Sequence, residues 1–584
     1  MRDLIDFFPI HLDIKQALLV LPKSEYQYFI KHSEGGLKLI EFPSGESDPS
    51  EDDLSRSPNS HLTNTSRASG LANYAVTPVT SAGVPLSNSY LNQAEDGKGL
   101  LLLEATKETT SPIQLEIRKG SQVIATINFP VKISKVENMY RHIDLTQVPL
   151  DYDGGSPGAA ASPIGTKTVD PGSAYPDSLT NGKYFVFLHG FNVPVHRARG
   201  WNAEIFKRMH QMGSKARFVG ITWTGATGIP IAGTPSNIGN AESSTDYHKA
   251  VFFAMQTGGA FAPALAFTQG ADVTVAAHSL GNMVVGEAIQ NGGFTPSRYY
   301  IINGAVPTEA YDPGLATDAE RWAMTEAQWK PFGTIHQQRL YSSSWHTLFP
   351  TSDNRSRLTW KNRFERVLRL DISHNFYSTG DDVVQNPIYD TALGGIYNEW
   401  VSRGAWGNQE LMKGTGLASY VQSRYQGGWG FNFNPQQFPE YQGYVKPTFG
   451  GFRMYYPEET PADVPGGIND EQLETKPFFK PFKEVDLFSP TLGSAKAGEL
   501  KVQRDVLGAG VPARSYAIAA NPVQGLAGNH NMDELRTWPD SWPVENHDGE
   551  STGQWLHSDF RDVAINYLHK MYAKMIELGE LNED

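Results

Sequence analysis

From residue 184 onward the sequence alternates short apolar stretches with longer stretches of helical periodicity, and this alternation restricts the fold more than any other feature. Buried strands are expected at 184–189, 218–223, 273–277, 299–305 and 367–377, and helices at 199–212, 246–267, 280–289 and 560–578. Strands that alternate with helices form a mostly parallel sheet with helices on both faces, because each parallel pair needs a crossover connection. We therefore expect an α/β fold for this part of the chain.

The sequence before residue 183 does not show this alternation of strands and helices. Residues 1–150 contain short strand-like stretches, at 17–21, 99–104, 113–118 and 123–129, and are expected to form a small N-terminal β-sandwich-like domain. Residues 45–70 within it are dense in Ser, Asp and Asn and are interpreted as a solvated loop. Residues 151–182 are rich in Gly, Pro, Ser and Ala, which is typical of a linker. The α/β domain is then expected to cover residues 183–584.

Two insertions are expected within the α/β domain, at about 307–366 and about 386–546. The second is aromatic-rich: 15 of the 60 residues from 397 to 456 are Phe, Trp or Tyr, against 11% for the whole chain. Many Gly, Pro and Asn residues lie between them, so these aromatics cannot all form one regular helical core. They either wall a cleft or pack a cap against one another, and the sequence favours neither.

Composition excludes several classes of function. The formal net charge of −14 argues against a nucleic-acid surface or an anionic membrane partner, since both need clustered Lys and Arg. The absence of Cys excludes disulfides, thiolate metal sites and cysteine nucleophiles. The most apolar helical stretch, 250–267, is interrupted by Gly and Pro, so no membrane span is expected. No signal peptide is visible, which leaves the compartment open between the cytoplasm and secretion with the signal removed.

A serine stands where an expected strand meets an expected helix, in VTVAAHSLGNMVV (273–285). Catalytic groups gather at the carboxyl ends of parallel strands, and Ser279 lies at such an end. A sharp strand-to-helix turn needs small residues two positions away on either side, and Ala277 and Gly281 meet this need. The turn also directs the N–H of Leu280 toward an oxyanion formed at Ser279. Ser279 is interpreted as a nucleophile in preference to a simple helix cap.

Several motifs together resemble the α/β-hydrolase superfamily, in its esterase and lipase branch, over roughly residues 183–580. FVFLHGFN (185–192) is similar to the family's His-Gly loop, and this likeness implies that the N–H of Phe191 is the second oxyanion donor, with Asn192 as a neighbouring candidate. GITW (220–223) and AHSLGN (277–282) are similar to the next strand end and to the nucleophile elbow. Ala277 stands where the family more often has Gly.

The resemblance also implies an acid and a base, in the order Ser, Asp, His along the chain. The stretch ISHNFYSTGDDVV resembles the family's acid turn and selects Asp381, with Asp382 as the alternative. WLHSDF places His557 just before the final helix, where the family has its histidine. His530 and His547 are competitors for the base because they precede His557 in a polar, aromatic-rich stretch.

Two further histidines are given supporting roles. His278, beside the nucleophile, is interpreted as a structural residue of the elbow, and His189 as a residue that orients the oxyanion loop. His374, Asp381 and Asp382 are close in sequence but lack a recognisable ligand spacing, so no metal site is expected. No cofactor is expected either, because the proposed chemistry needs none.

Together, these expectations predict a serine hydrolase that cleaves a carboxylic ester through a Ser279–His557–Asp381 triad and an acyl-enzyme. The N–H groups of Leu280 and Phe191 would form the oxyanion hole. The substrate would be a small-molecule or polymeric ester. An amidase or thioesterase would use the same residues. A catalytically inert protein that binds a glycan or another polymer is the alternative from a different class.

Overall fold

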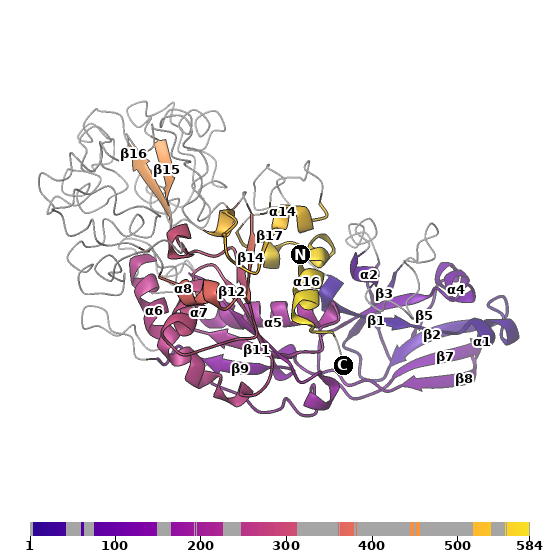
Figure 1. Ribbon diagram of the computed structural model, residues 1–584. Coiled ribbons are helices and arrows are strands. Elements are labelled where there is room, and N and C mark those ends of the chain that lie inside the picture. Colours follow the sequence, from indigo (N-terminus) through magenta and orange to yellow (C-terminus); the bar gives the residue numbers. More distant parts are fainter. Residues whose placement is uncertain are drawn as a thin grey trace, which may run out of the picture.

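The structure is a computed structural model, and it describes residues 4–42, 60–63, 75–148, 165–191, 193, 195–225, 247–311, 360, 363–378, 381, 444–448, 451–455, 518–538, 555 and 557–582. An antiparallel β part, formed by the N-terminal residues, lies beside an α/β body that contains the C-terminal helix (Figure 1).

The α/β body is built on a seven-stranded sheet in the order β17-β14-β13-β12-β10-β11-β9. Every neighbouring pair in it is parallel, which confirms the expected α/β class. Its central strands are buried along their whole length, as a sheet covered on both faces requires. The strands are β9 (Arg141–Asp144), β10 (Tyr184–Leu188), β11 (Arg217–Thr222), β12 (Val273–His278), β13 (Arg298–Ile302), β14 (Ser373–Tyr377) and β17 (Gly528–Asn531).

Helices cover the two faces of this sheet, and the alternation of side chains along β10 shows how. Val186 and Leu188 belong to the core beneath α6 and α7, whereas Phe185 and Phe187 belong to the core beneath α5 and α16. The main helices are α5 (Val195–Gln211), α6 (Tyr247–Ala264), α7 (Gly281–Gln290) and α16 (Ile565–Gly579). Shorter ones are α8 (Glu365–Arg369), α14 (Met532–Leu535) and α15 (Asp559–Asp562).

Two expected elements in this body prove to be divided. The helix expected at 560–578 is α15 followed by α16, because Val563 and Ala564 are extended. The carbonyls of Arg561 and Val563 accept hydrogen bonds from the side chain of Arg208. The strand expected at 367–377 is α8 followed by β14. A short apolar stretch does not by itself distinguish the end of a helix from the start of a strand.

The N-terminal part contains two four-stranded antiparallel sheets, β1-β6-β3-β4 and β5-β2-β7-β8, which are compatible with the expected sandwich-like domain. The strands are β1 (Phe7–His11), β2 (Gln27–His32), β3 (Leu37–Phe42), β4 (Thr77–Val79), β5 (Val84–Pro85), β6 (Leu100–Ala105), β7 (Ile113–Lys119) and β8 (Gln122–Phe129). Short helices, α1 (Lys15–Val20), α2 (Ser60–Thr63) and α4 (Asn88–Glu95), accompany them. The strand expected at 17–21 is wrong: its apolar run forms α1, which buries Leu18 and exposes Leu19 and Val20.

Strand β6 connects the two parts of the molecule. Leu101 and Leu103 lie in the core between the two N-terminal sheets, while Leu100 and Leu102 lie in the core that α5 and α16 share with the parallel sheet. Strand β9, although it precedes residue 150, pairs with β11 of the parallel sheet. Of the aromatic-rich stretch, the described residues form the hairpin of β15 (Tyr444–Thr448) and β16 (Gly451–Tyr455), and the expectation about its side chains lies outside the described residues.

Candidate active site

Ser279 occupies a strained turn between β12 and α7. Its φ of 53° lies in the left-handed region, which is costly for a residue other than Gly and persists only where the surroundings hold it. The surroundings do so here: the N–H of Ser279 donates to the carbonyl of Ile302 (3.0 Å), and the carbonyl of Ser279 accepts from the N–H of Ala305 (3.1 Å) and from the side-chain amide of Asn282 (2.9 Å). The side chain of Ser279 is thereby held at the carboxyl end of the sheet.

Two glycines allow this turn to pack against the loop after β10. A Cβ at Gly281 would lie 2.5 Å from the carbonyl oxygen of His189, and a Cβ at Gly190 would lie 2.6 Å from the Cβ of Ser279. Atoms at such distances overlap, so a side chain at either position would force the two turns apart. The small residue expected two positions after Ser279 is therefore explained by contact with the His-Gly loop.

His189 fastens that loop to the end of β11. Its Nδ1 donates to the carbonyl of Gly190 (3.0 Å), its Nε2 accepts from the N–H of Trp223 (3.3 Å), and the indole N–H of Trp223 donates to the carbonyl of His189 (2.8 Å). Burial lowers the pKa of His189 to about 4, so the ring is neutral near pH 7 and one nitrogen remains an acceptor. These contacts fit the orienting role expected of His189.

The two expected oxyanion donors belong to the two turns that meet at Ser279: Leu280 follows Ser279 directly, and Phe191 follows Gly190, which packs against Ser279. Leu280 is fully buried at the start of α7, and its N–H has no acceptor among the residues that the structure describes. An N–H at a helix start also benefits from the helix dipole when it faces a negative charge. Phe191 is half-buried and packs on the core beneath α6 and α7. Asn192, the neighbouring candidate, lies outside the described residues.

Asp381 and His557 lie in direct contact. The Nδ1 of His557 donates to Oδ2 of Asp381 at 2.6 Å, and the side chains are 6% and 0% exposed, respectively. Water therefore competes little for this hydrogen bond. Asp382 and His547 lie outside the described residues. His530 is on β17, where its Nε2 lies 3.2 Å from Nδ1 of His374, and it contacts Phe376.

His278 joins the segment that carries His557 to the strand that carries Ser279. Its Nε2 lies 2.9 Å from the backbone carbonyl oxygen of His557 and must therefore carry the hydrogen. The two imidazole centroids are 4.7 Å apart. Burial, followed by the nearby His557, lowers the pKa of His278 well below its usual range, so His278 stays neutral. This contact gives the elbow histidine a definite structural role.

The segment around His557 is also attached to the acid turn. The hydroxyl of Ser378 donates to the carbonyl of Trp555 (2.6 Å), and the N–H of Trp555 donates to Oδ1 of Asp533 (2.6 Å). The N–H of Asp381 in turn donates to the carbonyl of Ser378 (3.2 Å). The acid and the base are thus linked through the backbone as well as through their side chains.

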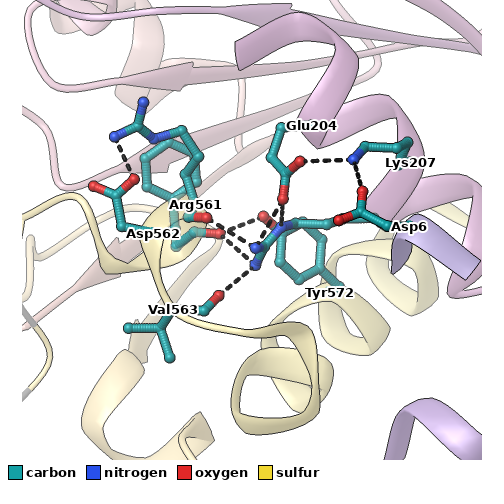
Figure 2. A network of polar contacts seen from close by, with 9 residues as sticks. Asp6, Glu204, Lys207, Arg561, Asp562, Val563 and Tyr572 are labelled. Atoms are coloured by element: carbon teal, nitrogen blue, oxygen red, sulfur yellow. Dashed lines mark hydrogen bonds and ion pairs between the residues drawn. The ribbon is translucent and has the colours of Figure 1, made fainter. Parts of the chain in front are cut away.

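On the other side of His557, the turn between α15 and α16 is held by α5 (Figure 2). The guanidinium of Arg208, almost completely buried, donates to the carbonyls of Arg561 (2.8 Å) and Val563 (2.9 Å), and its Nε donates to Glu204 (3.0 Å). The hydroxyl of Tyr572 donates to the carbonyl of Phe560 at 2.5 Å. We call Arg208 and its ion-pair partner Glu204, which are both on α5, the α5 clamp.

Sequence reasoning missed the residues that hold the acid and the base. Asn303 donates to Asp381, Ser378 and Asp533 hold Trp555, and Arg208 holds the turn after α15. The Asn303-Gly304 pair signals a turn at the end of a strand, but it gives no sign of the bond to Asp381. Arg208 had no such signal, because the carbonyls to which it donates lie more than 350 residues away in sequence.

Comparisons with known proteins give little further information. No protein-family model matches the chain, and no curated protein matches it. The solved structures that are similar at a low level include the following two. A candidate aryl esterase from Burkholderia cenocepacia is 14% identical, with a TM-score of 0.16 over 34% of this chain and 73% of that one. Lipase B from Aspergillus fumigatus is 13% identical, with a TM-score of 0.19 over 60% of this chain and 66% of that one. Such scores support no conclusion about function.

Two further findings concern other kinds of site. Within the described ranges, no group of three or more His, Asp or Glu side chains is arranged to hold a metal ion. No helix in those same ranges is both long and apolar enough to span a membrane.

Proposed function

We propose that this protein is a serine hydrolase that cleaves a carboxylic ester. The contact that supports this most is the buried one between His557 and Asp381. The backbone of His557 is in turn bonded to His278, the residue directly before Ser279. Because Nδ1 of His557 donates to the carboxylate, Nε2 is the ring nitrogen that would take the proton from a nucleophile. Ser279, in its strained turn directly after His278, is the candidate nucleophile.

The proposed reaction proceeds in two halves. The oxygen of Ser279 attacks the ester carbonyl carbon while its proton passes to Nε2 of His557, and the carbonyl oxygen becomes an oxyanion. The N–H groups of Leu280 and Phe191 bind this oxyanion, and Asp381 stabilises the imidazolium. The C–O bond to the alcohol then breaks as His557 returns the proton to the leaving oxygen. Water, activated by the same histidine, hydrolyses the acyl-enzyme and restores the serine.

The experiment is covalent labelling with a fluorophosphonate, combined with turnover of short p-nitrophenyl esters. The intact protein should be labelled at Ser279 and should hydrolyse the esters, and Ser279→Ala should abolish both. Ser173→Ala, at an exposed serine, serves as the matched control and should change neither. If folded protein is not labelled, the proposal fails and the inert binding protein is favoured. Turnover of a matched thioester or anilide in preference to the ester would identify a thioesterase or an amidase.

A further inference from the structure

Asn303 lies directly between the proposed nucleophile and the proposed acid. It follows β13, whose neighbours in the sheet are β12 and β14. The N–H of Asn303 donates to the carbonyl of Phe376 on β14 (3.0 Å), and the carbonyl of the preceding Ile302 accepts from the N–H of Ser279 (3.0 Å). Two consecutive residues at the end of β13 therefore hold the elbow on one side and the strand that leads to Asp381 on the other.

The side chain of Asn303 contacts the proposed acid itself. Its Nδ2 donates to Oδ2 of Asp381 at 2.9 Å, and the same oxygen accepts from Nδ1 of His557 at 2.6 Å. Asn303 and Asp381 are both fully buried. The opposite orientation of the amide would place its oxygen against the carboxylate, which is repulsive, so the NH₂ group must face Asp381. The Oδ1 of Asn303 is buried without a hydrogen-bond partner in the described part of the chain.

We propose that Asn303 is a positioning residue of the hydrolase, which fixes the carboxylate of Asp381 so that Oδ2 faces His557. This inference rests on the proposed function. The torsion about Cβ–Cγ of an aspartate is broad, so one hydrogen bond to His557 does not set the plane of the carboxylate. A second donor, from another strand and to the same oxygen, restricts this torsion further. His557 is then held with Nε2 directed toward Ser279 throughout the proton transfers.

The backbone of Asn303 makes a selective test practical. Its φ of 42° lies in the left-handed region, which Asn tolerates better than most residues and Gly adopts freely. Asn303→Gly therefore removes the amide group without straining the turn. We expect kcat and the rate of fluorophosphonate labelling to fall about ten- to a hundredfold, the range for loss of one hydrogen bond to a charged group. KM should stay within about twofold, since Asn303 lies behind Asp381.

Asn303→Asp provides a readout that a purely structural role would not change. Two carboxyl groups in contact cannot both ionise readily, so the pair retains one proton to a higher pH than a lone aspartate. While it is protonated, the introduced carboxyl group donates to Asp381 and supports activity. As the pH rises and this proton is lost, the two charges repel and the orientation is lost. The pH profile of kcat should therefore gain a falling alkaline limb that the wild-type protein lacks.

Asn375→Asp is the matched control. Asn375 is a fully buried asparagine on β14, and its Nδ2 donates to the carbonyls of Ile518 (3.2 Å) and Asn521 (2.8 Å) and not to Asp381. This variant should lower the melting temperature and leave the shape of the pH profile unchanged. The comparison separates a pH effect specific to Asp381 from the general cost of a buried charge.

The outcomes distinguish the two proposals. If the wild-type protein is labelled at Ser279, while Asn303→Gly is labelled at the wild-type rate and Asn303→Asp keeps the wild-type pH profile, the role of Asn303 is refuted and the hydrolase stands. If the wild-type protein is not labelled, the proposed function itself fails. A melting temperature lowered equally in Asn303→Asp and Asn375→Asp, with the new alkaline limb in the first alone, supports the inference.

Discussion

Replacement of Gly190 by Ala tests how closely the elbow and the His-Gly loop are packed. The new Cβ would lie 2.6 Å from the Cβ of Ser279, 3.0 Å from the carbonyl oxygen of His278 and 3.1 Å from Nδ1 of His278. Carbon atoms in contact normally lie about 3.5–4.0 Å apart, so Ser279 or the loop must move by about 1 Å. All three neighbours belong to buried residues at the centre of the fold, so the strain has no easy route of relief.

The expected cost has two parts. Overpacking of a buried site lowers the free energy of unfolding by about 1–3 kcal/mol. A displacement of about 1 Å at a reacting group reduces its rate by a factor on the order of a hundred. Urea denaturation measures the first effect, and the second-order rate constant of fluorophosphonate labelling at Ser279 measures the second.

Gly259→Ala is the control for this variant. Gly259 is an exposed residue of α6, and its Cβ would meet nothing within 4 Å. Alanine in a helix should raise the free energy of unfolding by about 0.5–1 kcal/mol, with no change in labelling. If Gly190→Ala were as stable and as reactive as the wild-type protein, the close approach of the two turns would be wrong.

Two other perturbations test the supports of the site. Arg208→Met removes the α5 clamp and leaves buried carbonyls without donors; urea denaturation should show a loss of at least about 2 kcal/mol, and a smaller loss than about 0.5 kcal/mol would contradict the clamp. Burial lowers the pKa of His189 and of His374 to about 4, below the unfolded value of about 6.5. Protonation of either histidine therefore favours the unfolded state. Their contribution to the free energy of unfolding is lost as the pH falls from about 6.5 toward 4. Denaturation measured between these pH values should show a slope of up to about 1.4 kcal/mol per pH unit for each histidine, and His374→Asn should reduce it; equal stability at pH 7 and pH 5 would refute the assignment.

The α/β body was predictable because its signals are local. Each strand is a short apolar run, each long helix has its own periodicity, and the strand-turn-helix around Ser279 requires small residues that the sequence displays. The elements that differ from the prediction are those in which a local signal is ambiguous. The apolar run of α1 is too short to show a period. The break after α15 lies beside carbonyls that bond to Arg208, a residue far away in sequence.

The residues of the candidate site also fall into those with a local sequence signal and those without one. Ser279, Asp381 and His557 are identified by motif, and the structure brings Asp381 and His557 into contact, while their catalytic roles remain a proposal. Asn303 is a different case, since its importance comes from a left-handed φ and from a partner 78 positions later. Neither can be read from the residue type, because many asparagines follow strands without bonding to an acid.

The burial of β6 on both of its faces determines how the protein can unfold. Alternate leucines of this strand belong to two different hydrophobic cores, so β6 cannot separate from one core without exposing the other to solvent. Truncation before residue 150 would remove an apolar wall from beneath α5 and α16, and with it β9 at the edge of the large sheet. The first 150 residues are thus not an exchangeable appendage, and heat should melt both halves in one cooperative step.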